Sequence, residues 1–283
     1  MRINTIGVVS AGSICCGDGP ESGLRRRIMY GQVTSGRPPL AEPIDVVLGH
    51  RLSPSAQRFA AEHADFLVRV DFRDIADHSD PYIRSAEAHC SCDGVRHTIW
   101  LDTKSADFEG LMLHQAMRGI LMERGFPRTK CPPCAALFPF LLYLSSLLGS
   151  AITDPVIDRW LTQEDLRVYD RELLVRRTTA QVWLDARRGP PKEYGLLFCK
   201  WALLTVLMRL DPTFERETTN LLYALIRKKF PEPWGLGDEL SQSIRQKGFT
   251  EPHSALYAML ELRSALRLED KIEIIDAEGI RLR

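Results

Sequence analysis

The residues best suited to chemistry lie in the stretch from Phe108 to Pro127, which directly follows a predicted strand. It reads FEGLMLHQAMRGILMERGFP, so a single histidine, His114, stands in a mostly apolar segment with the spacing of a helix. Side chains four residues apart share one face of a helix, which places Arg118 beside His114. The predicted helix therefore presents an imidazole, the amide of Gln115 and a guanidinium close together.

This helix resembles the active-site helix of the zincin metallopeptidases, whose pattern is His-Glu-x-x-His. In that motif two histidines bind one zinc ion, and the glutamate is the general base that acts on metal-bound water. The Gly-Phe-Pro turn at 125–127, the apolar helix that follows and the segment Asp154–Asp158 are also similar to small bacterial zincin-like domains related to the phage-immunity metallopeptidases. The resemblance covers roughly residues 95–160 and implies an α+β core.

The motif is degenerate at two of its three positions. His114 stands at the first ligand position, but Gln115 replaces the general base and Arg118 replaces the second histidine. A glutamine amide cannot accept the proton of a water molecule, and a guanidinium has no lone pair for a metal. The resemblance therefore implies a pseudoenzyme, a non-catalytic relative. If Asp154 occupies the place of the third ligand, we expect Arg118 to pair with it, its cation taking the electrostatic place of the metal.

Two other interpretations of this helix stay open. The chain could be a metal-dependent hydrolase, a peptidase, that uses His114, Asp154 and a further ligand that the sequence does not identify. It could also be an unrelated helical protein in which His114 is an ordinary buried histidine. The zincin interpretation requires residues 105–124 to form a helix that packs on the strand containing Trp100.

Four cysteines form a second candidate site. Cys131 and Cys134 have the Cys-x-x-Cys spacing of zinc sites, and Cys90 with Cys92 could complete four ligands, with His89 beside them. Such a site would make the chain a structural zinc protein of deaminase-like or zinc-ribbon type. The simpler alternative is a set of reduced thiols. Our expectation is that no cofactor is bound, with zinc as the alternative.

Composition excludes several classes of protein. The 283 residues carry 37 Lys+Arg and 37 Asp+Glu, so the chain lacks the basic excess of a general nucleic-acid binder. Seven cysteines, an odd number, do not indicate a secreted disulfide framework, and we expect a cytoplasmic protein with reduced thiols. The short basic runs Arg25–Arg27 and Arg227–Lys229 are interpreted as solvated surface. The uncharged segment Cys131–Thr153 is long enough to cross a membrane, but its prolines and serines favour a buried helix.

Local signals predict the elements around the candidate site. Ser53 and Pro54 begin a helix that continues to Val68, residues 69–102 are extended with a strand at His97–Leu101, and Gly125 ends the helix of residues 105–124. A buried helix is expected near residues 135–150, a short one from Pro155, and a long one over 162–188 that begins with a capping box at Thr162. The remaining predictions are helices at about 193–210, 211–230, 236–247 and 250–267, and a hairpin of strands 271–275 and 280–282.

Together these patterns predict an α+β protein with a small sheet and an active-site-type helix in its first half, a mainly helical second half and a short C-terminal hairpin. The expected organisation is an irregular N-terminal arm (1–50), a zincin-like α+β core (51–160) and a helical region packed on it (161–283). The expected function is that of a catalytically inactive, zincin-like binding or scaffold protein. Its partner would be a protein or peptide held by strand addition along a sheet edge.

Overall fold

The computed structural model describes residues 44–79, 83–92, 96–131, 139–166, 171–214, 217–276 and 278–282. It confirms the α+β class: small sheets lie in the first half, the second half is helical, and an antiparallel hairpin follows near the C-terminus. Most of the predicted arm, residues 1–43, lies outside the described part. Its last residues form a two-stranded ribbon, β1 (Val46–Val47) with β2 (His50–Arg51), whose turn places Gly49 at a φ of 83°.

The first helix begins where Ser53 predicts it. The Ser53 hydroxyl accepts a hydrogen bond from the amide of Ala56, and α1 (Pro54–Glu62) is followed after a break at His63 by the single turn α2 (Ala64–Leu67). The same hydroxyl donates to the Glu109 carboxylate, 2.9 Å away, so this cap also joins α1 to the start of the candidate helix.

The extended region forms a three-stranded sheet of order β3-β5-β4. Strand β3 (Val70–Asp74) runs parallel to β5 (His97–Leu101), and β4 (Ala88–Cys92) runs antiparallel to it. The alternating sequence of β5 gives alternating burial, with Ile99 and Leu101 fully buried. Strand β5 has the predicted bounds, and helix α3 (Phe108–Glu123) packs on β4 and β5, as the zincin interpretation requires.

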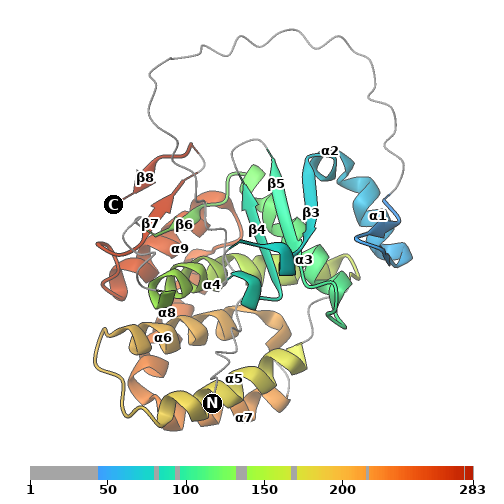
Figure 1. The fold of residues 1–283 in the computed structure, drawn as a ribbon. Helices are drawn as coiled ribbons and strands as arrows, with labels where there is room; N and C mark the ends of the chain where they lie inside the picture. The colour runs from blue at the N-terminus through green and yellow to red at the C-terminus, as the bar shows by residue number, and fades with distance from the viewer. Residues whose placement is uncertain are drawn as a thin grey trace.

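One long helix occupies the centre of the molecule. Helix α4 (Pro139–Gln163) packs on α3, on α6 and on α9 (Figure 1), and most of its residues from 144 to 158 are buried. The predicted break at Pro155 is wrong, because the helix continues through this proline. The predicted helix start at Thr162 is wrong as well: α4 ends at Gln163, and the Thr162 hydroxyl donates to the Asp158 carbonyl inside it.

The second half is helical, as expected. Figure 1 shows α5 and α7 side by side along one edge of the molecule, with α6 and α8 between them and the remainder. The predicted start of α8 near residue 236 is five residues late, because Pro231 occupies the first helical position. The helices are α5 (Arg171–Ala186), α6 (Leu196–Leu210), α7 (Glu217–Lys229), α8 (Pro231–Lys247) and α9 (Pro252–Ala265).

The C-terminal hairpin is present and gains a third strand. Strands β7 (Glu273–Ile275) and β8 (Arg281–Leu282) are antiparallel, and β6 (Arg128–Lys130) pairs with β7 through the register Thr129 with Ile274. The buried guanidinium of Arg263 on α9 donates to the carbonyls of Ile272 and Leu282, which fixes the hairpin to the helices.

A single hydrophobic cluster extends from Val47 to Ile274, so the sheet half and the helical half share one core. Within the described residues, Phe140–Gln163 of α4 is long and apolar enough to span a membrane, with a mean hydropathy of 1.5. Of its most apolar window, 61% is buried inside the protein, and core helices of soluble proteins have the same composition.

Candidate functional site

The candidate site lies where α3 and α4 face each other. Helix α3 contributes His114 and Arg118, and α4 contributes Asp154 and Asp158. Each pair has the four-residue spacing that places two side chains on one helix face. The structure thus brings together the three predicted binding residues, His114, Arg118 and Asp154, and adds Asp158 as a fourth.

The strongest contact is the ion pair of Arg118 with Asp154. The guanidinium donates to Asp154 Oδ1, and the same nitrogen lies 3.3 Å from the hydroxyl of Ser150. Both charged side chains are buried, with residue exposures of 5% for Arg118 and 7% for Asp154. Burial alone would raise the pKa of Asp154, but the cation of Arg118 and the neighbouring His114 outweigh it, so the pKa lies well below its ordinary value.

His114 lies between the two carboxylates. Its Nε2 atom is 3.5 Å from Asp154 Oδ1, and its Nδ1 atom is 3.4 Å from Asp158 Oδ1. These distances exceed those of good hydrogen bonds, and Asp158 is fully buried. When His114 is protonated, two cations face two carboxylates and the four side chains have no net charge. We call these four residues the ion cluster.

Gln115, at the position of the expected general base, does not join the ion cluster. The residue is fully buried, and neither of its amide atoms has a hydrogen-bond partner in the described ranges. A buried amide without partners costs stability. Beside the ion cluster, Arg118, Ser150 and Thr153 line a crevice of about 30 Å³. That volume is close to the space that one water molecule occupies, so a peptide chain does not fit there.

The cysteines of the second candidate site lie apart in the chain and in the fold. Cys90 and Cys92 are on β4, and Cys131 follows β6 with its thiol 3.4 Å from the carbonyl of Leu141. Cys134 falls outside the described residues. Among the residues that the structure does describe, no group of three or more histidine, cysteine or acidic side chains is arranged to hold a metal ion. The thiol of Cys92 lies 3.8 Å from Nε2 of His97, on the neighbouring strand.

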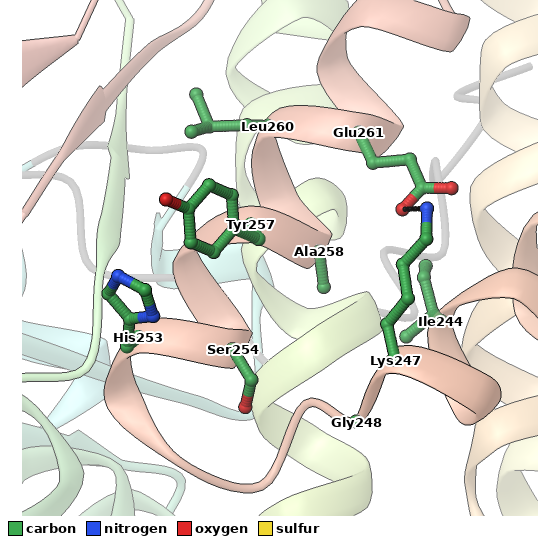
Figure 2. A pocket seen from close by; sticks show the side chains of 9 residues that line it. All are labelled: Ile244, Lys247, Gly248, His253, Ser254, Tyr257, Ala258, Leu260 and Glu261. Carbon is green, nitrogen blue, oxygen red and sulfur yellow. Dashed lines mark hydrogen bonds and ion pairs between the residues drawn. The ribbon is translucent and has the colours of Figure 1, made fainter.

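A larger hollow lies elsewhere, over α8 and α9. It measures about 670 Å³, and its apolar lining includes Ile244, Ala258 and Leu260. Figure 2 shows Lys247 and Glu261 joined on one side, with 2.8 Å between their charged atoms, and His253 and Tyr257 on the other. None of the residues predicted for the site lines it.

Two features of the charged interior were missed from the sequence. Asp158 lies in the segment that carries the resemblance but was not assigned to the site, although its four-residue spacing from Asp154 was the available signal. The buried ion pair of Lys200 with Asp185, 2.6 Å apart between α6 and α5, carries no motif. Comparison of the chain with protein-family models, with curated proteins and with solved structures found no match.

Proposed function

We propose that the chain is a zincin metallopeptidase-like protein that has lost catalysis and works as a cytoplasmic binding or scaffold protein. One observation carries the proposal: Arg118 of α3 forms a buried ion pair with Asp154 of α4. A guanidinium at this position balances the carboxylate that would otherwise bind a divalent cation, and it repels such a cation. In this view the ion cluster holds α3 against α4 and needs no metal.

Binding would use the edge of the sheet. Strand β3 is the outermost strand beside β5, and it pairs with β5 alone in the described part of the chain. Its side chains alternate in exposure, with Asp71 and Arg73 outside. An extended segment of a protein partner could add to this edge through backbone hydrogen bonds, while these two charges select its sequence.

Metal analysis of the purified protein tests the loss of the metal site. We expect zinc well below one equivalent, both in the unaltered protein and in Arg118→Met. Stoichiometric zinc that is lost in His114→Ala would overturn the proposal in favour of a metal-dependent hydrolase. Zinc that persists in His114→Ala but is lost in Cys131→Ala would instead assign the metal to the cysteines.

Peptide binding tests the second half of the proposal. A library of extended peptides is titrated by fluorescence polarisation with a chelator present. We expect some of the peptides to bind. The double variant Asp71→Lys with Arg73→Glu, which exchanges the two edge charges, should bind a different set of peptides. The exchange Lys247→Glu with Glu261→Lys, over α8 and α9, is the matched control. Strand addition at β3 would be refuted if no peptide bound, or if only the control variant changed the set of peptides that bind.

A further inference from the structure

One surface unites exposed apolar and basic side chains from two helices. On α5, Trp183 and Leu184 are 50% and 49% exposed, and on α7 Leu221 is 77% exposed. Large apolar side chains at such exposures mark interaction surfaces when they gather together. We call this surface the basic face; it comprises Trp183, Leu184, Leu221, Arg187, Arg188, Arg227, Lys228 and Lys229.

The two helices bring their basic ends to the same place. Helices α5 and α7 pack side by side, and Lys229, the last residue of α7, lies with its ammonium 4.7 Å from the ring centre of Trp183, three residues before the end of α5. Arg187 and Arg188 follow Trp183 by about one helical turn. The run Arg227–Lys229, which the sequence indicates as ordinary solvated surface, thus meets a second basic run from a different helix.

The positive charge of the basic face is poorly offset. Arg187, Arg227 and Lys228 are exposed, and none of the three forms an ion pair within the described residues. Arg188 lies 3.5 Å from the carboxylate of Asp185, but Asp185 is fully buried and is bound more closely by Lys200, at 2.6 Å. Glu193 and Glu232 are the exposed acids that follow these runs in the chain. A protein with no net charge therefore concentrates five basic side chains at this edge.

We infer that the basic face is a docking surface for an anionic phospholipid membrane. Basic side chains are attracted to the negative surface of such a membrane, while exposed tryptophan and leucine side chains enter its interfacial region. The arrangement fits single-stranded nucleic acid less well, because Lys229 already lies over the ring of Trp183 on which a base would stack. Leu184 and Leu221 offer a base no aromatic surface at all.

Vesicle co-sedimentation of the full chain tests the inference. The probes are vesicles of phosphatidylcholine alone and of phosphatidylcholine with phosphatidylglycerol in equal parts. We expect binding to the anionic vesicles only, weakened by salt because the attraction is screened. Arg227→Glu with Lys228→Glu should lower the partition coefficient at least about 25-fold, since each basic side chain near an anionic surface contributes roughly a fivefold factor. The double variant Arg227→Gln with Lys228→Gln removes the two charges without reversing them, so it is less disruptive to folding. It should lower the partition coefficient by a smaller factor.

The matched control, Lys271→Glu with Arg281→Glu, makes the same charge change near the C-terminal hairpin, at the opposite end of the molecule from α5 and α7 (Figure 1). It should bind vesicles as the unaltered protein does. Trp183→Ala and Leu221→Ala should each weaken binding at constant charge. Equal binding to neutral vesicles, equal losses in the control, or binding of a labelled single-stranded oligonucleotide without binding of vesicles would overturn the inference.

Discussion

Two of the places where the described residues bury charge are built differently. Between α5 and α6, a single carboxylate, Asp185, is bound by Lys200 at 2.6 Å, by the amide of Gln181 at 3.0 Å and more weakly by Arg188 at 3.5 Å. Between α3 and α4, the ion cluster contains two carboxylates and two basic groups, and both contacts of His114 are longer than 3.3 Å.

The comparison shows that burial alone does not distinguish a structural ion pair from a site of the kind that we propose between α3 and α4. Asp185 and Asp158 are equally inaccessible. One short ion pair is enough to join two helices, as Lys200 and Asp185 demonstrate. The ion cluster adds a second carboxylate and the long contacts of His114 to the short ion pair of Arg118 with Asp154, and under the proposed function this excess of ionisable groups is retained from a metal site. Measurements on the two groups can therefore test the difference.

The largest effect is expected when Arg118 loses its charge. Arg118→Met leaves Asp154 buried opposite no guanidinium, and breaking a buried ion pair from one side costs about 3–5 kcal/mol in the free energy of unfolding. Urea denaturation measures this. Arg118→Met with Asp154→Leu should recover most of the loss, because removing both charges is close to neutral. A double variant as unstable as the single one would show that the pair is not the source of the effect.

A smaller loss, about 2–3 kcal/mol, is expected for Lys200→Met, because Asp185 keeps the amide of Gln181 and the nearby Arg188. Burial lowers the pKa of Lys200 even though Asp185 favours its charged form, so part of the ion-pair energy is already offset by desolvation. The same urea titration measures this variant. If Lys200→Met lowered the free energy of unfolding more than Arg118→Met does, the Lys200–Asp185 pair would contribute more stability than the Arg118–Asp154 pair. Our ranking of these two ion pairs would then be reversed.

Acid should affect the ion cluster next. The pKa of Asp154 is lower in the folded protein than in the unfolded chain, so its contribution is present above the unfolded value near 4 and is lost as the pH falls below it. Each pKa unit of difference corresponds to about 1.4 kcal/mol. The free energy of unfolding, followed from neutral pH to pH 3, about one unit below the unfolded pKa, should therefore fall by about 1 kcal/mol more in the unaltered protein than in Arg118→Met with Asp154→Leu. Parallel curves would contradict the assignment.

The smallest effect is expected at a partly exposed reference pair. Arg177 of α5 forms a bidentate ion pair with Glu87, just before β4, and joins the two halves of the molecule. Both side chains are 23% exposed, so solvent screens this partly buried pair more than the two buried groups, and we expect it to contribute about 1 kcal/mol. Glu87→Gln, measured by thermal unfolding, should therefore change stability less than either buried substitution. If Glu87→Gln lost as much stability as Arg118→Met, the exposure of an ion pair would not predict its contribution to stability.

Much of the fold could be predicted because its signals are local. Ser53 with Pro54 specifies a helix start, the alternation in His97–Leu101 specifies a strand, and the spacing within Phe108–Glu123 specifies a helix. The break expected at Pro155 was wrong for a tertiary reason: α4 is enclosed by α3, α6 and α9, and packing around it compensates for the backbone hydrogen bond that proline cannot donate. The capping box at Thr162 begins no helix because Thr162 lies in the last turn of α4, where its hydroxyl donates to the carbonyl of Asp158.

The candidate site was only partly predictable. The pairing of Arg118 with Asp154 followed from two spacings and one resemblance, and the ion pair is present. Asp158 was not assigned to the site although it lies four residues from Asp154, and the Lys200–Asp185 pair was missed because nothing in either sequence segment indicates the other. The pairing of β6 with β7 was missed for the same reason: strands that meet from distant parts of a chain carry no local record of their partner.

The sheet of β6, β7 and β8 affects the order in which the protein can fold while it is synthesised on the ribosome. Chains are synthesised from the N-terminus, so Arg128–Lys130 emerges long before its partner Glu273–Ile275 has been made. Until then β6 remains an unpaired strand in a nascent chain whose central helix is already complete. The final closure of this sheet therefore waits until Glu273–Ile275 has been made, and in that interval the strand is open to chaperones or to pairing with another nascent chain.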